Sequence, residues 1–405
     1  MKFNVKTERE ILLDALSKLE RYILQEKYKG YDPYDGLTSP IFRLPILKSR
    51  KTIRLGAQQL LKRLPVNIRP LLGIKKSYEP TTLGLCLQAY SYLLSVFPEK
   101  KDRYLKEIQF CMDELERLQS RGYRGVCWGY SFDWEARYAR IPAFTPNIVV
   151  TGVITQALFS LYKHGRTEVE IPDRVPLVRA QCAVPLQLCR SACDFVLYDL
   201  NRTYEDGSFC FSYSPLDRQR VYNATMKGAR LLAQVYSVTR ETDLKETATQ
   251  TVRYVVKNQK PDGSWLYSKG DTRTWVDNFH TGYVLDSLQE FILYTGATEY
   301  EGILQRGYDY YRRTFFTGEG IPKYYSTRTY PIDSTVVAQS LLTLIRFGDI
   351  DLATQVALWA VRHMQAKEGY FYYQMKRWGT NRIPYMRWSN AWMFLSLASL
   401  VSQLR

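Results

Sequence analysis

The stretch DGSWLYSKGDTRTWVDNFHTG, residues 262–282, decides the fold, because segments of the same kind recur along the chain. It begins with an acidic residue, a glycine and a short aromatic run. It ends with Asp277 and Asn278, where an amphipathic helix is predicted to start. A plain connector needs only turn residues, so this concentration of aromatic and charged side chains indicates loops with a shared role. Comparable loops cover residues 122–147, 206–223, 318–333 and 368–390.

Between these loops, apolar residues recur at the spacing i, i+3, i+4 and i+7 that is typical of amphipathic helices. The predicted helices cover about 5–29, 80–97, 101–120, 147–163, 175–199, 220–238, 243–259, 278–295, 299–315, 333–347, 350–365 and 386–403. Polar side chains at the ends of the loops are expected to cap the helices that follow. These expected caps are Asn147, Asn223, Asp277 or Asn278, Asp333 and Ser389.

A recurrent helical hairpin cannot bury its apolar face alone, so the hairpins must stack on one another or close into a ring. Closure gathers all the aromatic loops at one end, and counting back to the helix at 80–97 gives a sixth inner helix. We therefore predict an all-α protein, an (α/α)6 toroid of helical hairpins with short strand-like loops at one end. The toroid is expected over residues 79–405. Residues 1–78 are expected to form an N-terminal helix and a basic extension packed on it.

The predicted loops form an aromatic and charged funnel, which is typical of carbohydrate sites. Sugar rings stack on Trp and Tyr, while Arg, Asn and carboxylates bind the hydroxyl groups. The expected substrate-binding residues are Trp128, Tyr130, Trp134, Arg137, Asn147, Trp265, Arg273, Trp275, Asn278, Tyr325, Asp333, Tyr373, Arg387 and Trp388.

The formal charge of +16, from 56 Lys and Arg against 40 Asp and Glu, favours an acidic partner. We expect an acidic oligosaccharide or polysaccharide, or a sugar linked to a lipid or nucleotide. The basic run at 47–76 has no interleaved aromatic residues, which disfavours nucleic acid but suits a peripheral contact with an anionic membrane. No signal sequence or membrane span is predicted, so we expect a cytoplasmic location, in part at the inner face of the membrane. The motifs of nucleotide and metal sites are absent, so no cofactor or metal is expected.

The motifs also resemble known families. The element DGSW, the aromatic loops and the paired helices resemble the six-hairpin and related toroid enzymes of glycan metabolism, among them glucuronyl C5-epimerases. More narrowly, GYDPYDGL, CWGYSFDWEAR, TPNIVVTG and YMRWSNAWM resemble the VpsJ-like proteins associated with surface-polysaccharide assembly. This resemblance spans Gly30 to Met393 and implies a toroid fold and a role in glycan biosynthesis.

For an acidic sugar, C5 epimerisation and β-elimination both begin by removing the proton next to the carboxylate. That step needs a base and cations that neutralise the carboxylate, and epimerisation also needs an acid on the opposite face. His280, about one turn into an inner helix, or a loop tyrosine such as Tyr267 or Tyr324 is the expected base, and a facing tyrosine is the expected acid.

Two alternatives stay open. Glycoside hydrolysis needs two carboxylates that flank the bond, and Asp133, Glu135, Asp277 and Asp333 are the loop carboxylates in question. In the run FDWEAR, the spacing i, i+2 of an extended segment points Asp133 and Glu135 the same way. The other alternative is a non-catalytic scaffold that binds an anionic glycan or a lipid-linked intermediate. The segment YDPYDGL at 31–37 is expected to be a simple turn, and the less favoured alternative is that it folds over the funnel and adds Asp32 or Asp35.

Overall fold

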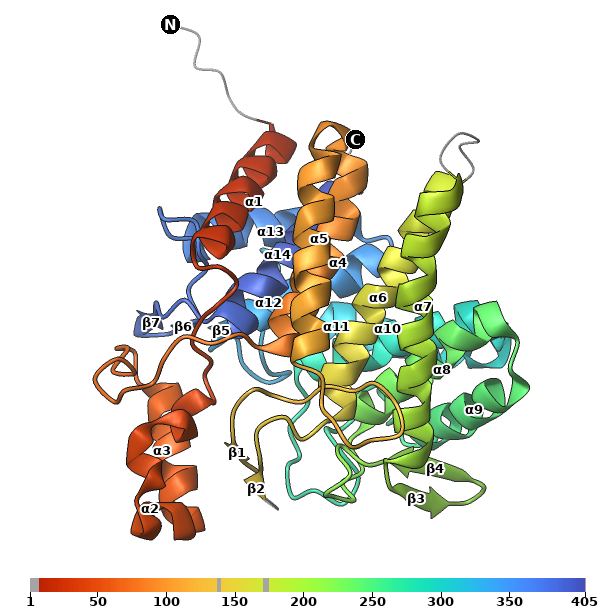
Figure 1. Ribbon diagram of the computed structural model, residues 1–405, viewed down its shortest axis with the longest axis horizontal. Coiled ribbons are helices and arrows are strands. Elements are labelled where there is room, and N and C mark those ends of the chain that lie inside the picture. The colour runs from red at the N-terminus through yellow and green to blue at the C-terminus, as the bar shows by residue number, and fades with distance from the viewer. Residues whose placement is uncertain (1–6, 137–139, 170–174, 405) are drawn as a thin grey trace, which may run out of the picture.

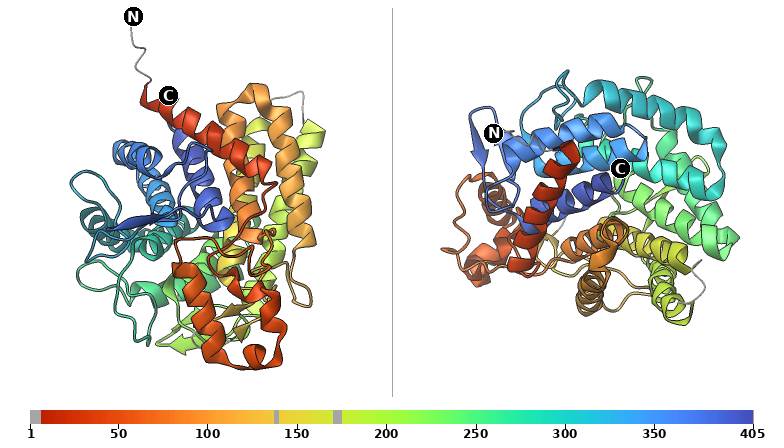
Figure 2. Two further views of the ribbon diagram at one scale, coloured as in Figure 1. Left: turned by 90° about the vertical axis from the view of Figure 1, so that its left-hand side faces the viewer. Right: turned by 90° about the horizontal axis from the view of Figure 1, so that it is seen from above.

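The computed structural model describes residues 7–136, 140–169 and 175–404, and these form a ring of helical hairpins (Figure 1). Each inner helix contacts the next one around the ring, and the last inner helix contacts the first, which closes the toroid. The view from above in Figure 2 shows the helices arranged around a common axis. The inner helices are α4 (Pro80–Val96), α6 (Ile148–Val169), α8 (Tyr222–Thr239), α10 (Asn278–Thr295), α12 (Ser334–Arg346) and α14 (Trp392–Val401).

The outer helices pack on this ring with one apolar face each. In α5, for example, Tyr104, Ile108, Cys111 and Leu115 are the buried residues, at the spacing of an amphipathic helix. By contrast, α14 is buried on every side, as expected of a helix enclosed by neighbours. The outer helices are α5 (Lys101–Arg117), α7 (Val175–Tyr198), α9 (Thr242–Val256), α11 (Glu301–Thr314), α13 (Ile350–Met364) and α1 (Glu8–Gln25).

Helix α1 contacts α13 and α14, so the N-terminal helix is the outer partner of the last inner helix. The protein is therefore an all-α (α/α)6 toroid, which confirms the predicted fold class.

The aromatic loops lie together at one end of the toroid, where the inner helices begin, and short antiparallel strands brace them. One hairpin pairs β1 (Trp134–Glu135) with β2 (Arg140–Ile141), and a second pairs β3 (Arg202–Glu205) with β4 (Ser208–Phe211). A three-stranded sheet with the strand order β5–β6–β7 joins two loops that are far apart in the chain. Its strands are β5 (Ile332–Asp333), β6 (Gln374–Lys376) and β7 (Gly379–Asn381). Strand β5 precedes α12, whereas β6 and β7 follow α13.

The chain between α1 and α4 forms an extension at the same end. It contains the short helix α2 (Pro45–Ser49) and the longer α3 (Lys51–Arg63), which the periodicity did not predict. Helix α3 buries its polar side chains Arg54 and Gln58 against the β1 segment, where Arg54 Nε donates to Glu135 Oε2 at 2.6 Å. Polar residues on the buried face explain why an apolar pattern was not visible in the sequence.

Three of the predicted helix caps are present. Oδ1 of Asn147, Asp277 and Asp333 accepts a backbone N–H of the first turn of α6, α10 and α12, at 2.9 Å in each case. The other two predictions were wrong. Helix α8 begins after Val221, so Asn223 lies inside its first turn, and Ser389 lies inside a π-helical turn, Met386–Ala391, that precedes α14.

Six cysteines in the described part of the chain are buried and free, namely Cys86, Cys111, Cys127, Cys189, Cys193 and Cys210. Among the described residues, no helix is long and apolar enough to cross a membrane, and no cluster of His, Cys, Asp and Glu is placed to hold a metal ion.

The buried ion pair between Arg387 and Asp32 predicts a large loss of stability when one partner is removed. Replacing Asp32 by Asn keeps an acceptor for the Tyr34 amide but leaves the buried guanidinium without its main charge partner. We expect Asp32→Asn to cost about 3 kcal/mol or more, measured by urea or thermal unfolding. Lys18→Met, which breaks the exposed pair with Asp14, should cost under about 1 kcal/mol. Equal losses in the two variants would show that the buried pair does not hold the fold.

Candidate functional site

A cavity of about 320 Å³, here called the loop-side cavity, lies at the end of the barrel where the inner helices begin. Its walls are mostly aromatic, with His280 and three cationic side chains among them. None of the described lining residues is Asp or Glu. The aromatic lining residues are Tyr34, Tyr130, Phe132, Trp134, Tyr213, Tyr267, Trp275, Phe279, Tyr283, Tyr324, Tyr325, Trp388 and Trp392.

His280 faces this cavity from the first turn of α10, and Asp277 holds its ring in place. Asp277 Oδ1 accepts the backbone N–H of His280 at 2.9 Å, and Oδ2 lies 2.6 Å from His280 Nδ1. The Asp277 side chain is fully buried, whereas that of His280 is 22% exposed. A carboxylate oxygen can only accept, so Nδ1 carries the hydrogen and the Nε2 lone pair is free to act as a base.

Aromatic rings pack against the imidazole, Tyr267 edge-on and Trp275 nearly parallel to it. The ring centroids of Tyr267 and Trp275 lie 4.7 and 6.1 Å from that of His280. The Arg273 guanidinium lies over both aromatic rings, 4.1 Å from the Tyr267 centroid, and it pairs with Asp271. Arg273 therefore presents a positive charge beside the imidazole on a platform of aromatic rings.

The N-terminal extension supplies another part of the lining. Tyr34 packs edge-on against Trp388 at 5.8 Å between centroids, and Lys62 of α3 donates a hydrogen bond to the Tyr34 hydroxyl. The Lys62 ammonium lies 4.3 Å from the centre of the same ring. The extension is thus part of the cavity, and the turn at 31–37, which we expected to be a simple turn, carries a lining residue.

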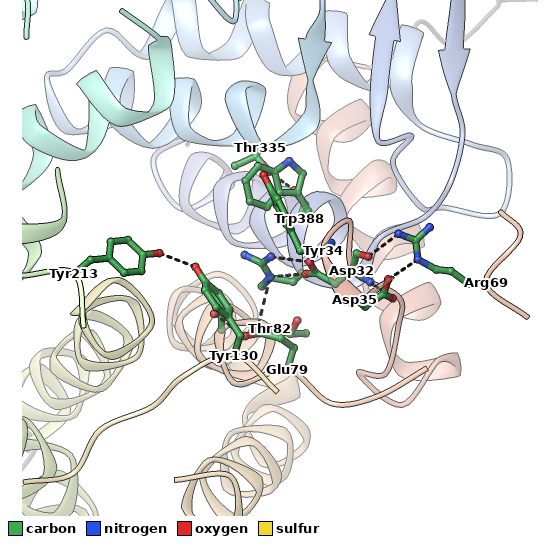
Figure 3. A network of polar contacts seen from close by, with 12 residues as sticks. Asp32, Tyr34, Asp35, Arg69, Glu79, Thr82, Tyr130, Tyr213, Thr335 and Trp388 are labelled. Carbon is green, nitrogen blue, oxygen red and sulfur yellow. Dashed lines mark hydrogen bonds and ion pairs between the residues drawn. The ribbon is translucent and has the colours of Figure 1, made fainter. Parts of the chain in front are cut away.

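Arg387 anchors that turn. Its Nε and Nη2 donate to the two carboxylate oxygens of Asp32 at 2.6 and 2.9 Å, and Glu79 lies 3.8 Å away. Figure 3 shows Asp32 and Asp35 side by side, with Arg69 reaching Asp35 at 2.6 Å. Burial raises the pKa of the Glu79 carboxyl to about 7, against the lowering effect of Arg387.

On the other side of Arg387, its guanidinium lies 4.9 Å from the centre of the Tyr130 ring. The Tyr130 hydroxyl in turn hydrogen-bonds that of Tyr213 at 3.0 Å (Figure 3).

Asp333 lies behind the cavity wall rather than in it. Its Oδ1 accepts from Trp388 Nε1 at 2.9 Å and so fixes the orientation of a lining indole. Burial raises the pKa of the Asp333 carboxyl from 3.8 to about 7, while hydrogen bonds from Thr335 and Trp388 and the charge of Lys62 lower it. A buried carboxyl with this pKa is partly protonated at neutral pH, so it neutralises the cavity cations only in part.

The structure does not bring all the expected site residues together. Those that line the loop-side cavity are His280, Tyr267, Tyr324, Tyr130, Trp134, Arg273, Trp275, Tyr325, Arg387 and Trp388. Asp277 and Asp333 lie directly behind lining residues. Arg137 lies outside the described residues.

Asp133 and Glu135, the expected catalytic pair, are not in the cavity. Asp133 accepts from Arg140 and from the Ala143 amide within its own hairpin, and the buried Glu135 binds Arg54 of α3. The extended run therefore uses its two carboxylates to hold a hairpin and the extension, and neither carboxylate lines the loop-side cavity.

Five expected substrate-binding residues belong to the packed interior instead. The indole N–H groups of Trp128 and Trp265 donate to the backbone carbonyls of Leu115 and Val255, at 2.7 and 3.0 Å. Asn147 caps α6, Asn278 bonds Ser340 and Tyr311, and Tyr373 packs on Tyr385. None of the five lines the loop-side cavity.

Several lining residues were not expected. Lys62 was expected only as part of the basic run at 47–76, and Tyr34 as part of a turn. The others lie on inner helices, or at loop positions where the sequence does not reveal which way the side chain points. They are Thr81, Phe132, Val149, Val153, Tyr213, Asn223, Phe279, Tyr283, Thr335 and Trp392.

Comparison with solved structures finds the same fold in enzymes that act on sugars. Cellobiose 2-epimerase from Bacillus thermoamylovorans superposes with a TM-score of 0.60 and 13% identity, over 79% of this chain and 87% of that one. The GH76 alpha-mannanase from Bacteroides thetaiotaomicron gives 0.56 and 12%, over 81% and 87%. A "possible member of GH105 family" from Salmonella enterica gives 0.59 and 12%, over 99% and 96%. No protein-family model and no curated protein sequence matches the chain. At these identities the likeness shows the fold alone.

The raised pKa of Asp333 predicts how stability depends on pH. Between about pH 4 and pH 7 the folded carboxyl keeps a proton that the unfolded chain has lost, so this group makes stability fall as pH rises through that window. Asp333→Asn, which mimics the protonated form and keeps an acceptor for Trp388, should show a smaller fall in melting temperature from pH 5 to pH 8. Asp309→Asn, at an exposed position on α11, should follow the unmodified protein. Identical pH profiles for all three proteins would contradict this assignment.

Proposed function

We propose that the chain is a carbohydrate-active enzyme that removes a proton from a ring carbon next to the carboxylate of a uronic acid, with His280 as the base. The observation that carries the proposal is the His280–Asp277 pair, which faces an aromatic cavity whose described lining contains cations but no carboxylate. The outcome is C5 epimerisation or β-elimination, which share this first step.

The lining favours a sugar. Flat rings such as Trp134, Trp275 and Trp388 can stack on the C–H faces of a pyranose, and the phenols among them bind hydroxyl groups. The fold also occurs in a sugar epimerase and in an alpha-mannanase, which supports a carbohydrate substrate without naming it.

The positive charges favour an acidic sugar. Lys62, Arg273 and Arg387 line the same cavity, and Lys62 has no carboxylate within ion-pair distance among the described residues. Such a cation can neutralise a substrate carboxylate, which stabilises the carbanion-like state formed when the neighbouring proton leaves. Tyr34 is the proposed acid for epimerisation, because the hydrogen bond from Lys62 stabilises the phenolate left after proton donation.

Hydrolysis is the weaker candidate. It needs two carboxyl groups about 5 to 9.5 Å apart on either side of the bond. The nearby carboxyls of Asp277, Asp333 and Asp32 instead lie behind His280, Trp388 and Arg387.

A second candidate is epimerisation at C2 of an uncharged sugar. It uses the same proton abstraction next to a carbonyl group, and the toroid of a cellobiose 2-epimerase favours it. The position at which solvent hydrogen enters the sugar separates the two candidates. We extend the proposal to glycan assembly in the cytoplasm, with a polymeric, lipid-linked or nucleotide-linked substrate, on the basis of the charge and the sequence resemblance.

The proposal predicts solvent exchange at C5. The protein is incubated in D₂O with a panel of uronic-acid glycans and with cellobiose, and each C–H signal is followed by NMR. Deuterium at C5 of a uronic acid is the expected result, and a vinyl signal then identifies elimination. His280→Gln should lower the exchange rate by about 100-fold or more, because the base is lost.

Two further variants make the test specific. Asp277→Asn keeps the helix cap but weakens the hold on Nδ1–H, so the rate should fall by roughly tenfold or more while the melting temperature stays near that of the unmodified protein. His363→Gln, on the outer helix α13, should exchange normally. Exchange at C2 only would favour the second candidate. Bond cleavage without exchange, or exchange that survives His280→Gln, would overturn the proposal.

A further inference from the structure

A second cavity, of about 400 Å³, lies on the barrel axis beyond the floor of the loop-side cavity. We call it the far-side cavity. Val153, Tyr283 and Trp392 line both cavities and so form the partition between them. The far-side cavity is lined by all six inner helices, and exposed Leu293 and Gln403 lie at its edge, toward the carboxyl ends of those helices.

Lys227 is the unusual residue of this cavity. It lies on α8, is 2% exposed, and has no hydrogen bond or ion pair to any described residue. Its ammonium group lies 3.8 Å from the centre of the Tyr283 ring in the partition. A buried amine without a polar partner is costly, and a ring face compensates for only part of the lost hydration. The amine therefore lacks a partner that a bound ligand can supply.

Arg230, one turn further along α8, also has no ion-pair partner among the described residues. Its Nη2 donates to the Gly152 carbonyl at 2.7 Å, and no described carboxylate lies within ion-pair distance of it. Gly152 also permits the close packing of Lys227, because a Cβ at Gly152 would lie only 2.8 Å from Lys227 Cβ. Two buried cationic side chains thus lie one turn apart, and neither forms an ion pair with a described carboxylate.

Three of the four carboxylate oxygens in the cavity accept hydrogen bonds, whereas Asp286 Oδ1 accepts none from a described residue. Glu290 Oε1 pairs with Arg346 at 2.7 Å, and its Oε2 accepts from Gln234 at 2.6 Å. Asp286 lies 3.8 Å from Arg346 and accepts from Gln339 at 2.7 Å. Arg346 carries one positive charge against these two acids, so with Lys227 and Arg230 included the cavity carries at most one net positive charge.

We propose that the far-side cavity is a binding site for a small polyhydroxylated anion, a monosaccharide-sized ligand that carries one carboxylate or phosphate group. Lys227 and Arg230 hold the anionic group. Side-chain amides and a hydroxyl along the walls, those of Gln88, Gln156, Gln289, Gln339, Gln403 and Ser399, bind the sugar hydroxyls. The volume falls within the roughly 300 to 1,000 Å³ of small-molecule sites.

The site is independent of the proposed reaction, but its ligand would touch the partition. The Tyr283 ring lies 6.2 Å from that of His280 on one side and under the Lys227 ammonium on the other. A ligand in the far-side cavity therefore contacts a side chain that packs against the base of the loop-side cavity.

The test measures binding to the full chain by calorimetry and thermal shift. The probes are D-glucuronate, glucose 6-phosphate, inorganic phosphate and, as the uncharged control, D-glucose. Lys227→Met keeps the shape of the side chain and removes its charge, and Arg230→Gln is the second variant. Lys62→Met, in the loop-side cavity, is the matched control, because an acidic sugar can also bind there.

We expect at least one of the two anionic sugars to bind, and Lys227→Met and Arg230→Gln each to weaken its Kd tenfold or more, while Lys62→Met leaves that event unchanged. Tighter binding of glucuronate identifies a carboxylate ligand, and tighter binding of glucose 6-phosphate a phosphate ligand. Lys227→Met should also raise the melting temperature of the ligand-free protein, since an unpartnered buried amine is gone. The proposal would be overturned if glucose bound as tightly as the anionic sugars, or if anion binding were lost only in Lys62→Met. Because binding is the readout, the result does not depend on the exchange assay.

Discussion

The rest of the site depends on the buried guanidinium of Arg387. It lies at the seam where α14 meets α4 and closes the ring, and it holds Asp32 of the N-terminal extension with two hydrogen bonds. Removing one partner of a buried ion pair leaves an unpaired charge in the interior, which is costly. The pair therefore fixes the extension at Arg387, whose buried charge needs a carboxylate. Tyr34 and, through α3, Lys62 reach the loop-side cavity only because this turn is anchored. The same contact thus closes the fold and completes the cavity wall.

In both cavities the nearby carboxylates hydrogen-bond or pair with protein side chains. In the loop-side cavity, Asp277 and Asp333 hold His280 and Trp388 in place, and burial leaves Asp333 with a pKa of about 7. In the far-side cavity, Asp286 and Glu290 are taken up by Arg346 and glutamine amides. The surface that a ligand meets is therefore aromatic and cationic in the loop-side cavity. In the far-side cavity it combines amide and aliphatic side chains with Lys227, Arg230 and the paired acids. This arrangement suits anionic sugars better than reactions that need two free carboxylates.

The fold could be predicted because its signals are local. Apolar spacing marked the helices, Asp277 and Asp333 marked two of their starts, and the recurrence of DGSW-like loops required closure. The site could be predicted only in part, because loop residues do not reveal their direction. Trp128 and Trp265 look like sugar platforms in the sequence, yet their N–H groups bond backbone carbonyls in the core. Contacts across more than 300 residues, such as that of Asp32 with Arg387, leave no local pattern to read.

One signal in the sequence could have found both cavities. The inner-helix residues that face the axis recur at alternating spacings of four and three, as in the stripe of a coiled coil, and this stripe is not uniformly apolar. On α10 it runs through Phe279, Tyr283, Asp286 and Glu290, and on α8 through Asn223, Lys227 and Arg230. A packed barrel centre would carry Leu or Val at these positions. Polar and charged residues there, in a helix that is otherwise buried, require either partners across the axis or space for a ligand, and Lys227 has no hydrogen bond or ion pair to a described residue.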